Sequence, residues 1–211
     1  MASRTARPST TWPKTEWRPS RLLAAPSSPA PATVTRHSEP FRPGAAATIA
    51  DYNGVDKVSH IKDKLVEMVH LNETIFSSGI ASSHEAKPLA SGIYMNDAML
   101  SNVCKHNVTR FPYEIARLAQ DLAGGIVATL PSEQDLDNEE AGSIIRRFLK
   151  GRDDIPTEDR MRILRLIENM TLGRNAVGYL TESMHGAGSP QAQRIQILRG
   201  MDVESKKWHA R

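Results

Sequence analysis

The sequence predicts an all-α protein, an up-and-down helical bundle over residues 44–211 that follows a disordered leader over residues 1–43. From Ala45 onward, apolar residues recur at three- and four-residue steps, which is the period of an amphipathic helix. Residues 1–43 hold 8 of the 13 prolines and lack this period. No segment alternates apolar and polar residues as a strand does. Long helices with short connections favour antiparallel packing.

The leader is basic, whereas the predicted domain is slightly acidic. Of the net charge of +3, residues 1–43 contribute +5 and residues 44–211 contribute −2. The basic balance therefore belongs to the leader, and we expect no nucleic-acid partner. The leader is rich in Arg and Ser, as a transit peptide is, but its prolines oppose the amphipathic helix that such a peptide forms. We expect a disordered or non-native extension, with a targeting segment as the alternative.

Cys104 is the single cysteine, which excludes an intrachain disulfide and a multi-cysteine metal site. We expect it to be a buried structural residue, since only Lys105 and His106 stand near it to activate the thiol. No apolar run approaches the roughly 18 residues that a membrane-spanning helix needs. We therefore expect no membrane partner and a cytoplasmic location.

Glycine and proline divide the periodic part of the chain into segments. The expected helices are residues 58–76, 94–105, 112–122, 139–150, 157–180 and the segment from Pro190 onward. The stretch 77–88 is expected to break the first of them, and the segment that opens at Pro156-Thr157 is expected to be the longest. Residues 126–130, an apolar run between Gly125 and Pro131, are interpreted as a buried connector.

The strongest local feature is the segment ESMHGAGSP, residues 182–190. Its residues 185–189 read as a glycine-containing loop before a helix that Ser189 caps and Pro190 opens. Such a helix start suits a phosphate or another anion, Arg194 can add charge, and Glu182 can act as a general base. A plain helix–loop–helix connection is the commoner reason for such residues and stays the alternative.

Two Glu-x-x-His pairs suggest a second kind of site. Such pairs on two helices, with one Glu from each of two others, form the di-iron site of a four-helix bundle. The residues concerned are Glu67, His70, Glu182 and His185, with Glu114 and Glu168 as the further ligands. Because Gly186 follows His185 at a helix end, solvated polar pairs are the preferred interpretation. Arg110, before the helix that Pro112 opens, is a candidate anion ligand or a surface cap.

Three segments resemble the C-terminal region of the 4-hydroxybutyryl-CoA dehydratase/vinylacetyl-CoA isomerase family, within the 4-hydroxyphenylacetate 3-hydroxylase superfamily. They are residues 50–83, residues 102–133 and the segment ESMHGAGSPQAQRIQILRG at residues 182–200. The resemblance covers most of residues 44–211 and stops at the leader. It implies a fold similar to the C-terminal helical domain of acyl-CoA dehydrogenases, which contributes to the FAD site and to oligomerisation.

The resemblance also implies site residues and partners. Glu182 corresponds to an active-site carboxylate, and His185, Gly186, Ala187, Gly188 and Ser189 to the loop near the flavin, with Arg110 as a further cofactor ligand. The implied reaction is dehydration of 4-hydroxybutyryl-CoA, an acyl-CoA substrate, with FAD and an iron–sulfur cluster.

The cluster ligands are expected before residue 50, where this chain has its leader, so we expect no cluster in this chain and no activity of the chain alone. A truncation, a misread upstream frame or a separate N-terminal subunit would each explain that pattern. We expect a homo-oligomer or a complex with such a subunit. A non-catalytic assembly module is the third alternative.

Overall fold

The computed structural model describes residues 41–209. Residues 1–40, which hold Trp12 and Trp17, lie outside the described residues, and so does almost all of the predicted leader. The first helix, α2 (Phe41–Tyr52), begins inside the segment that we assigned to the leader. The predicted boundary after residue 43 is therefore too late, because Arg42 is fully buried and belongs to the helical domain.

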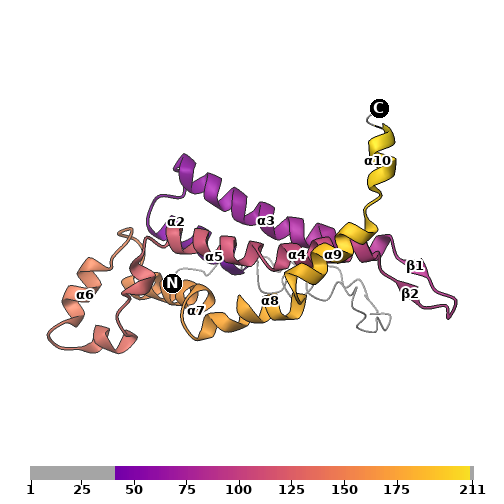
Figure 1. The fold of residues 1–211 in the computed structure, drawn as a ribbon. Helices are drawn as coiled ribbons and strands as arrows, with labels where there is room; N and C mark the ends of the chain where they lie inside the picture. The colour runs from indigo at the N-terminus through magenta and orange to yellow at the C-terminus, as the bar shows by residue number, and fades with distance from the viewer. Residues whose placement is uncertain (1–40, 210–211) are drawn as a thin grey trace, which may run out of the picture.

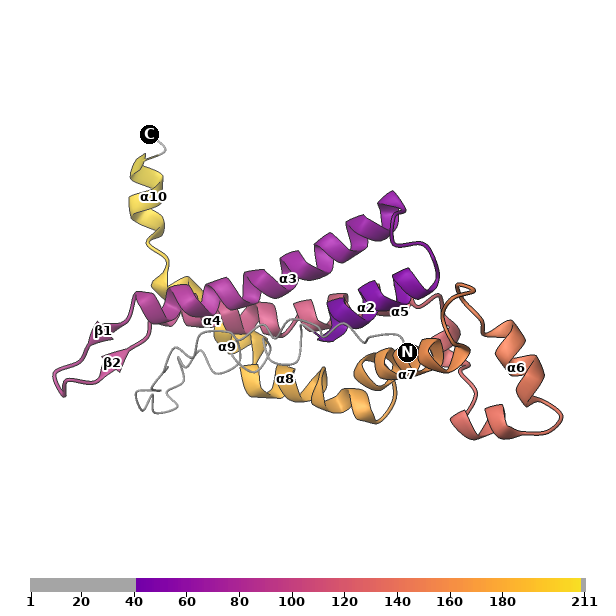
Figure 2. The same ribbon diagram turned by 180° about the vertical axis from the view of Figure 1, so that it is seen from behind.

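The described residues form a mostly helical, elongated bundle, as predicted (Figure 1). Its main helices are α2, α3 (Ser59–His84), α4 (Ala98–Val108), α5 (Phe111–Leu122), α7 (Thr157–Thr171) and α9 (Pro190–Gly200). Helix α2 packs against α3, α5 and α7, and α4 packs against α3 and α9. From behind, α2 lies in front of α5, between α3 and α7 (Figure 2).

The main apolar core lies where α2, α3, α5 and α7 meet. Its fully buried side chains include Ile49, Met68, Ile115 and Leu164. A smaller cluster of Ile75, Cys104, Val108 and Ala187 joins α3 and α4 to α8 (Thr181–Ala187). Half-buried Phe111 packs against both clusters, so the start of α5 connects the core to α8.

Helix α3 continues through residues 77–84, where the sequence suggested a break. The serines do not end it, because Ser78 and Ser83 donate to helix carbonyls one turn earlier, Thr74 and Gly79. Ser82 is buried, and its hydroxyl lies 2.5 Å from that of Ser101 on α4. The predicted break is therefore wrong, and α3, with 26 residues, is longer than α7 with 15.

A short antiparallel hairpin joins α3 to α4 at one end of the bundle (Figure 1). It pairs β1 (Lys87–Pro88) with β2 (Tyr94–Met95), which the sequence placed in a helix. Helix α4 starts only at Ala98, because the Asp97 side chain accepts the Leu100 amide at 2.8 Å and forms the N-cap. These two short strands have no alternating pattern in the sequence, and the bundle is otherwise helical in the described residues.

The second half of the chain follows the predicted order with shorter helices. Val127, in the 3-10 turn η1 (Ile126–Ala128), is buried, as expected of a connector. A second 3-10 turn, η2 (Glu133–Asp137), and α6 (Gly142–Phe148) form a lobe at the other end of the bundle (Figure 1). Helix α7 ends before Gly173, whose φ of +64° is left-handed, so the predicted continuation to Leu180 is wrong.

The chain turns back through η3 (Asn175–Gly178) into α8 and α9. The last helix, α10 (Val203–His209), stands apart from the bundle, and Trp208 on it is exposed (Figure 1). Within residues 41–209, no helix is both long and apolar enough to cross a bilayer.

Candidate functional site

Helix α8 separates its residues into a buried and an exposed face. Ser183 and Ala187 are buried, whereas Glu182, His185 and Gly186 are exposed. Residues 185–187 therefore form the last turn of this helix, and the predicted loop is reduced to Gly188 and Ser189. Glu182 and His185 lie one turn apart on the exposed face, so both can reach a molecule placed against it.

The turn from α8 into α9 is held by local hydrogen bonds. Gly188 has a left-handed φ of +85°, and the Ser189 hydroxyl accepts the Ala192 amide at 3.4 Å, which confirms the predicted cap. The buried Gln193 amide donates to the carbonyls of Ala187 at 2.9 Å and Gly188 at 3.1 Å. The turn thus presents the positive end of an 11-residue helix beside the exposed face of α8.

Arg110 precedes α5 as its N-cap residue, and its side chain is exposed and makes no capping bond. This end of α5 lies near α8, since the Tyr113 hydroxyl is 3.9 Å from the Met184 sulfur. The structure therefore brings a side chain from the first turn of α5 into contact with one from α8.

Arg42 is a buried residue of this region that the sequence did not reveal. Its guanidinium donates to the Pro112 carbonyl at 3.1 Å and to the Tyr179 carbonyl at 2.7 Å. It therefore ties the first turn of α5 to the segment that enters α8. An arginine between Phe41 and Pro43 in a proline-rich basic stretch carries no sequence signal for burial.

An anionic cofactor suits this surface. The start of α9 is electropositive, Arg194 is exposed in its second turn, and Arg110 lies exposed at the start of α5. A helix N-terminus and guanidinium groups each suit the pyrophosphate of a dinucleotide such as FAD.

The di-iron alternative is wrong. Among residues 41–209, no three or more His, Cys, Asp or Glu side chains come together as metal ligands. Glu114 instead pairs with Arg117, which lowers the pKa of its carboxyl through a hydrogen bond, and Glu168 pairs with Arg165. Glu67 and His70 are exposed on α3. Their three-residue spacing places them as neighbours on the solvated surface of that helix.

Cys104 is buried, as predicted, with its thiol 3.5 Å from the Ile75 carbonyl. Burial raises its pKa to about 11, partly offset by the charge of Lys105. An iron–sulfur cluster is held by several cysteine thiolates, and the described residues contain no cysteine besides this buried one. These residues therefore do not fit an iron–sulfur cluster.

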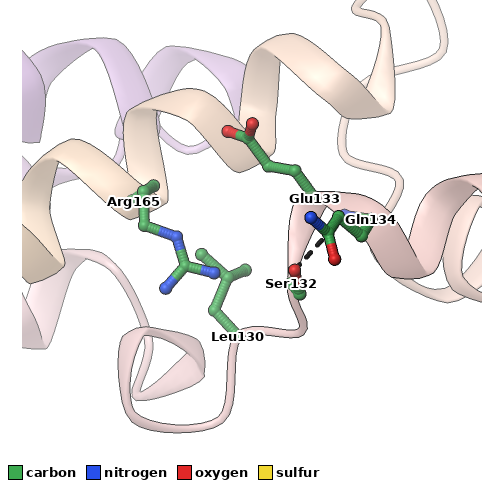
Figure 3. A pocket seen from close by; sticks show the side chains of 5 residues that line it. All are labelled: Leu130, Ser132, Glu133, Gln134 and Arg165. Atoms are coloured by element: carbon green, nitrogen blue, oxygen red, sulfur yellow. Dashed lines mark hydrogen bonds between the residues drawn. The ribbon is translucent and has the colours of Figure 1, made fainter.

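A separate open pocket of about 670 Å³ lies between η2 and α7. It is lined by Leu130, Ser132, Glu133, Gln134 and Arg165, and Figure 3 shows Arg165 extending from α7 toward Leu130. The Arg165 guanidinium is already occupied by Glu168 and by the Pro131 carbonyl at 2.7 Å. None of these residues belongs to α8, α9 or the start of α5, so this pocket is not part of the predicted site.

Curated relatives resemble this chain over its helical part. The chain is 56% identical over 172 residues to the 4-hydroxybutyryl-CoA dehydratase/vinylacetyl-CoA-Delta-isomerase of Clostridium aminobutyricum, covering 78% of this chain and 35% of that enzyme. It is 23% identical to the 4-hydroxyphenylacetate 3-monooxygenase oxygenase component of Geobacillus sp. (strain PA-9), covering 81% of this chain and 34% of that protein. The chain thus spans about a third of the length of these relatives.

Solved structures show the same relationship. An oxygen-tolerant archaeal 4-hydroxybutyryl-CoA dehydratase from N. maritimus superposes with a TM-score of 0.79 at 69% identity, covering 83% of this chain and 35% of that chain. The HpaB oxygenase component, solved with FAD and 4-hydroxyphenylacetate, superposes with a TM-score of 0.74 at 21% identity, covering 85% and 38%. The second likeness shows the fold alone, and it confirms the helical domain that the sequence predicts.

The family model HpaB, described as 4-hydroxyphenylacetate 3-hydroxylase C terminal, matches residues 41–211. Its first matched residue is also the first residue of α2. Through this helical region, the chain belongs to the 4-hydroxyphenylacetate 3-hydroxylase C-terminal family.

Proposed function

We propose that residues 41–209 form the C-terminal helical domain of a flavin-dependent enzyme that dehydrates 4-hydroxybutyryl-CoA and isomerises vinylacetyl-CoA. The observation that carries the proposal is the 69% identity to the archaeal 4-hydroxybutyryl-CoA dehydratase, against 21% to the HpaB oxygenase component. The chain spans about a third of such an enzyme. The active unit is therefore this domain together with further polypeptide, in the same chain or a separate subunit.

The exposed face of α8 supplies the acid–base group of this proposal. Glu182 is a carboxylate that can take a proton from a carbon of the acyl chain and return it at another carbon, as the isomerisation requires. His185, one turn further along the same face, can orient the substrate or the carboxylate by hydrogen bonding. Such a positioned base contributes about 10²- to 10⁴-fold to the rate.

The start of α9 and two guanidinium groups supply the cofactor side. Gly188 and Ser189, with Arg110 and Arg194, would hold the anionic part of FAD, and the cofactor would supply the electron chemistry at the acyl chain. These residues would hold the flavin on the side of Glu182, and the domain that completes the site would exclude water. This chain would not hold an iron–sulfur cluster by itself, because it has a single cysteine and that cysteine is buried.

The test is anaerobic purification of the protein from its own cells with everything that copurifies. Flavin is measured by absorbance, and conversion of 4-hydroxybutyryl-CoA to crotonyl-CoA by chromatography. We expect bound flavin and turnover, and Glu182→Gln should lower turnover about 10²- to 10⁴-fold while flavin stays bound. Glu67→Gln, at an exposed glutamate of α3, is the matched control and should leave turnover unchanged. Oligomers without flavin and without turnover would instead identify an assembly module.

A further inference from the structure

Arg42 is completely buried at the start of α2 and joins segments that are distant in sequence. One guanidinium nitrogen donates to the Pro112 carbonyl and another to the Tyr179 carbonyl, at separations of 70 and 137 residues. The guanidinium also lies 5.8 Å from the centre of the Tyr179 ring. A planar group with several fixed donors suits such a contact between two carbonyls.

The Tyr179 carbonyl also accepts a hydrogen bond from α8 itself. On the buried face of α8, the Ser183 hydroxyl donates to this same oxygen at 3.5 Å. Arg42 and Ser183 therefore converge on one atom, and Ser183 is the neighbour of Glu182 in the chain.

Helix α8 depends on contacts of this kind. It has seven residues, and its N-cap residue Leu180 has no side-chain cap. An isolated helix of this length is not stable in water, so tertiary contacts must set its position. The N-cap residue of α5, Arg110, makes no side-chain cap either.

We propose that Arg42 is a positioning residue that fixes the entry of α8 against the start of α5, and so sets where Glu182 and His185 lie relative to α5. The link to catalysis rests on the proposed function; the structural link between Arg42 and α8 does not. Arg42 touches none of the reacting groups and acts through the Tyr179 and Pro112 carbonyls.

The chain contains a matched control. Arg160, on α7, is also buried, and it donates to the Asn53 side chain and to the Leu149 carbonyl, each at 2.8 Å. It ties α2 to the connection before α7, and neither of its partners lies in α8 or at the start of α5. Arg160→Met therefore removes the same kind of buried guanidinium without touching the proposed site.

The experiment compares native-state amide hydrogen exchange in the 211-residue chain and in Arg42→Met, Arg42→Lys and Arg160→Met. In Arg42→Met, amides of residues 179–187 should exchange at least tenfold faster than in the parent, while those of α3 and α7 change much less. Arg42→Lys should show an intermediate effect, because an ammonium group replaces the fork that spans both carbonyls. If Arg42→Met does not fold, the comparison of Arg42→Lys with Arg160→Lys decides the question.

A second readout is the affinity for FAD, measured by quenching of flavin fluorescence. Arg42→Met should weaken binding at least tenfold, and Arg160→Met should not. Equal acceleration of exchange in α3, α7 and α8 would show that Arg42 serves only global stability, and would overturn the proposal. Faster exchange in α8 with unchanged FAD affinity would overturn its link to the site. These affinities are measured on each variant purified anaerobically with everything that copurifies, as in the test of the proposed function. If the parent purified in this way binds no FAD, the proposed function fails, and hydrogen exchange still decides whether Arg42 positions α8.

Discussion

A Cβ atom added at Gly151 would lie 2.3 Å from the carbonyl oxygen of Tyr52, so the two backbones are in direct contact. The Tyr52 oxygen also accepts the Arg152 amide at 2.8 Å. The connection before α7 is thereby closed onto the end of α2, beside the buried side chain of Arg160. Gly151 is needed here for the close approach of two chain segments, whereas α6 already ends at Phe148.

Gly151→Ala should destabilise the protein by about 1–3 kcal/mol, because backbone must move to make room for the methyl group. Gly44→Ala is the matched control, since no atom lies within 4 Å of the added Cβ in α2. It should stabilise the protein by about 0.5–1 kcal/mol through the better helix propensity of alanine. Urea unfolding followed by circular dichroism measures both, and equal effects of the two variants would contradict the contact.

The N-caps of α4 and α9 should differ in strength. Asp97 accepts the Leu100 amide at 2.8 Å, whereas Ser189 accepts the Ala192 amide at 3.4 Å. Asp97→Ala should therefore cost about 1–2 kcal/mol, and Ser189→Ala about 0.5–1 kcal/mol. Thermal unfolding of the two variants tests the order, and Asp97→Asn, which keeps an acceptor, should lose much less than Asp97→Ala.

Because of Cys104, the free energy of unfolding should fall at alkaline pH. Burial raises its pKa to about 11, above the roughly 8.5 of a thiol in the unfolded chain. The folded state therefore holds its proton longer, so this contribution to stability is fully present below about pH 8.5 and is lost as pH rises through 11. Its full size is about 3 kcal/mol.

Denaturant unfolding at pH 8 to 11 measures this effect. The loss of stability over that range should be smaller in Cys104→Ala than in the parent, whatever the two proteins' stabilities at pH 8. Iodoacetamide at pH 8.5 should label the folded parent far more slowly than the unfolded chain. Equal labelling rates would show that the thiol is accessible.

The 211-residue chain alone should not dehydrate 4-hydroxybutyryl-CoA, even with FAD added. Loss of a hydroxyl group from an unactivated carbon needs more than a base such as Glu182, which contributes about 10²- to 10⁴-fold against the 10⁶-fold or more of enzymes. A single cysteine cannot hold an iron–sulfur cluster that would assist the leaving group. Isomerisation of vinylacetyl-CoA mainly relocates a proton. We therefore expect this activity to survive the loss of a cofactor or subunit that abolishes dehydration.

Anaerobic assay of the pure chain with FAD, following crotonyl-CoA, is the measurement. Turnover that Glu182→Gln abolishes would show that the domain is self-sufficient and would refute this prediction. Turnover that appears only with a copurified partner would instead identify a split enzyme.

Local sequence signals predicted several elements correctly. Pro112 lies in the first turn of α5, Ser189 caps α9 with Pro190 after it, and Cys104 is buried. The helical fold was also predicted, because its apolar period extends over many turns. Signals of this kind act within one turn of the chain or are repeated along it, so they do not depend on what the rest of the molecule does.

The roles of Glu182, His185 and Arg110 remain predictions, but the structure does change how they are presented. The sequence placed His185 in a loop, whereas it lies in the last turn of α8 on the exposed face. A glycine such as Gly186 weakens a helix by only about 1 kcal/mol, and packing of Ser183 and Ala187 against the bundle outweighs that cost.

The sequence by itself determined that residues after about 44 form amphipathic helices. Its prolines and capping residues also determined where several of these helices begin. Only the tertiary structure decided that α3 continues through a serine-rich stretch, because Ser82 on α3 meets Ser101 on α4. It also decided that Arg42 belongs to the core, since its partners Pro112 and Tyr179 lie 70 and 137 residues away. The free energy of burying a serine or an arginine depends on whether hydrogen-bond partners meet it there, and those partners are supplied by distant parts of the chain.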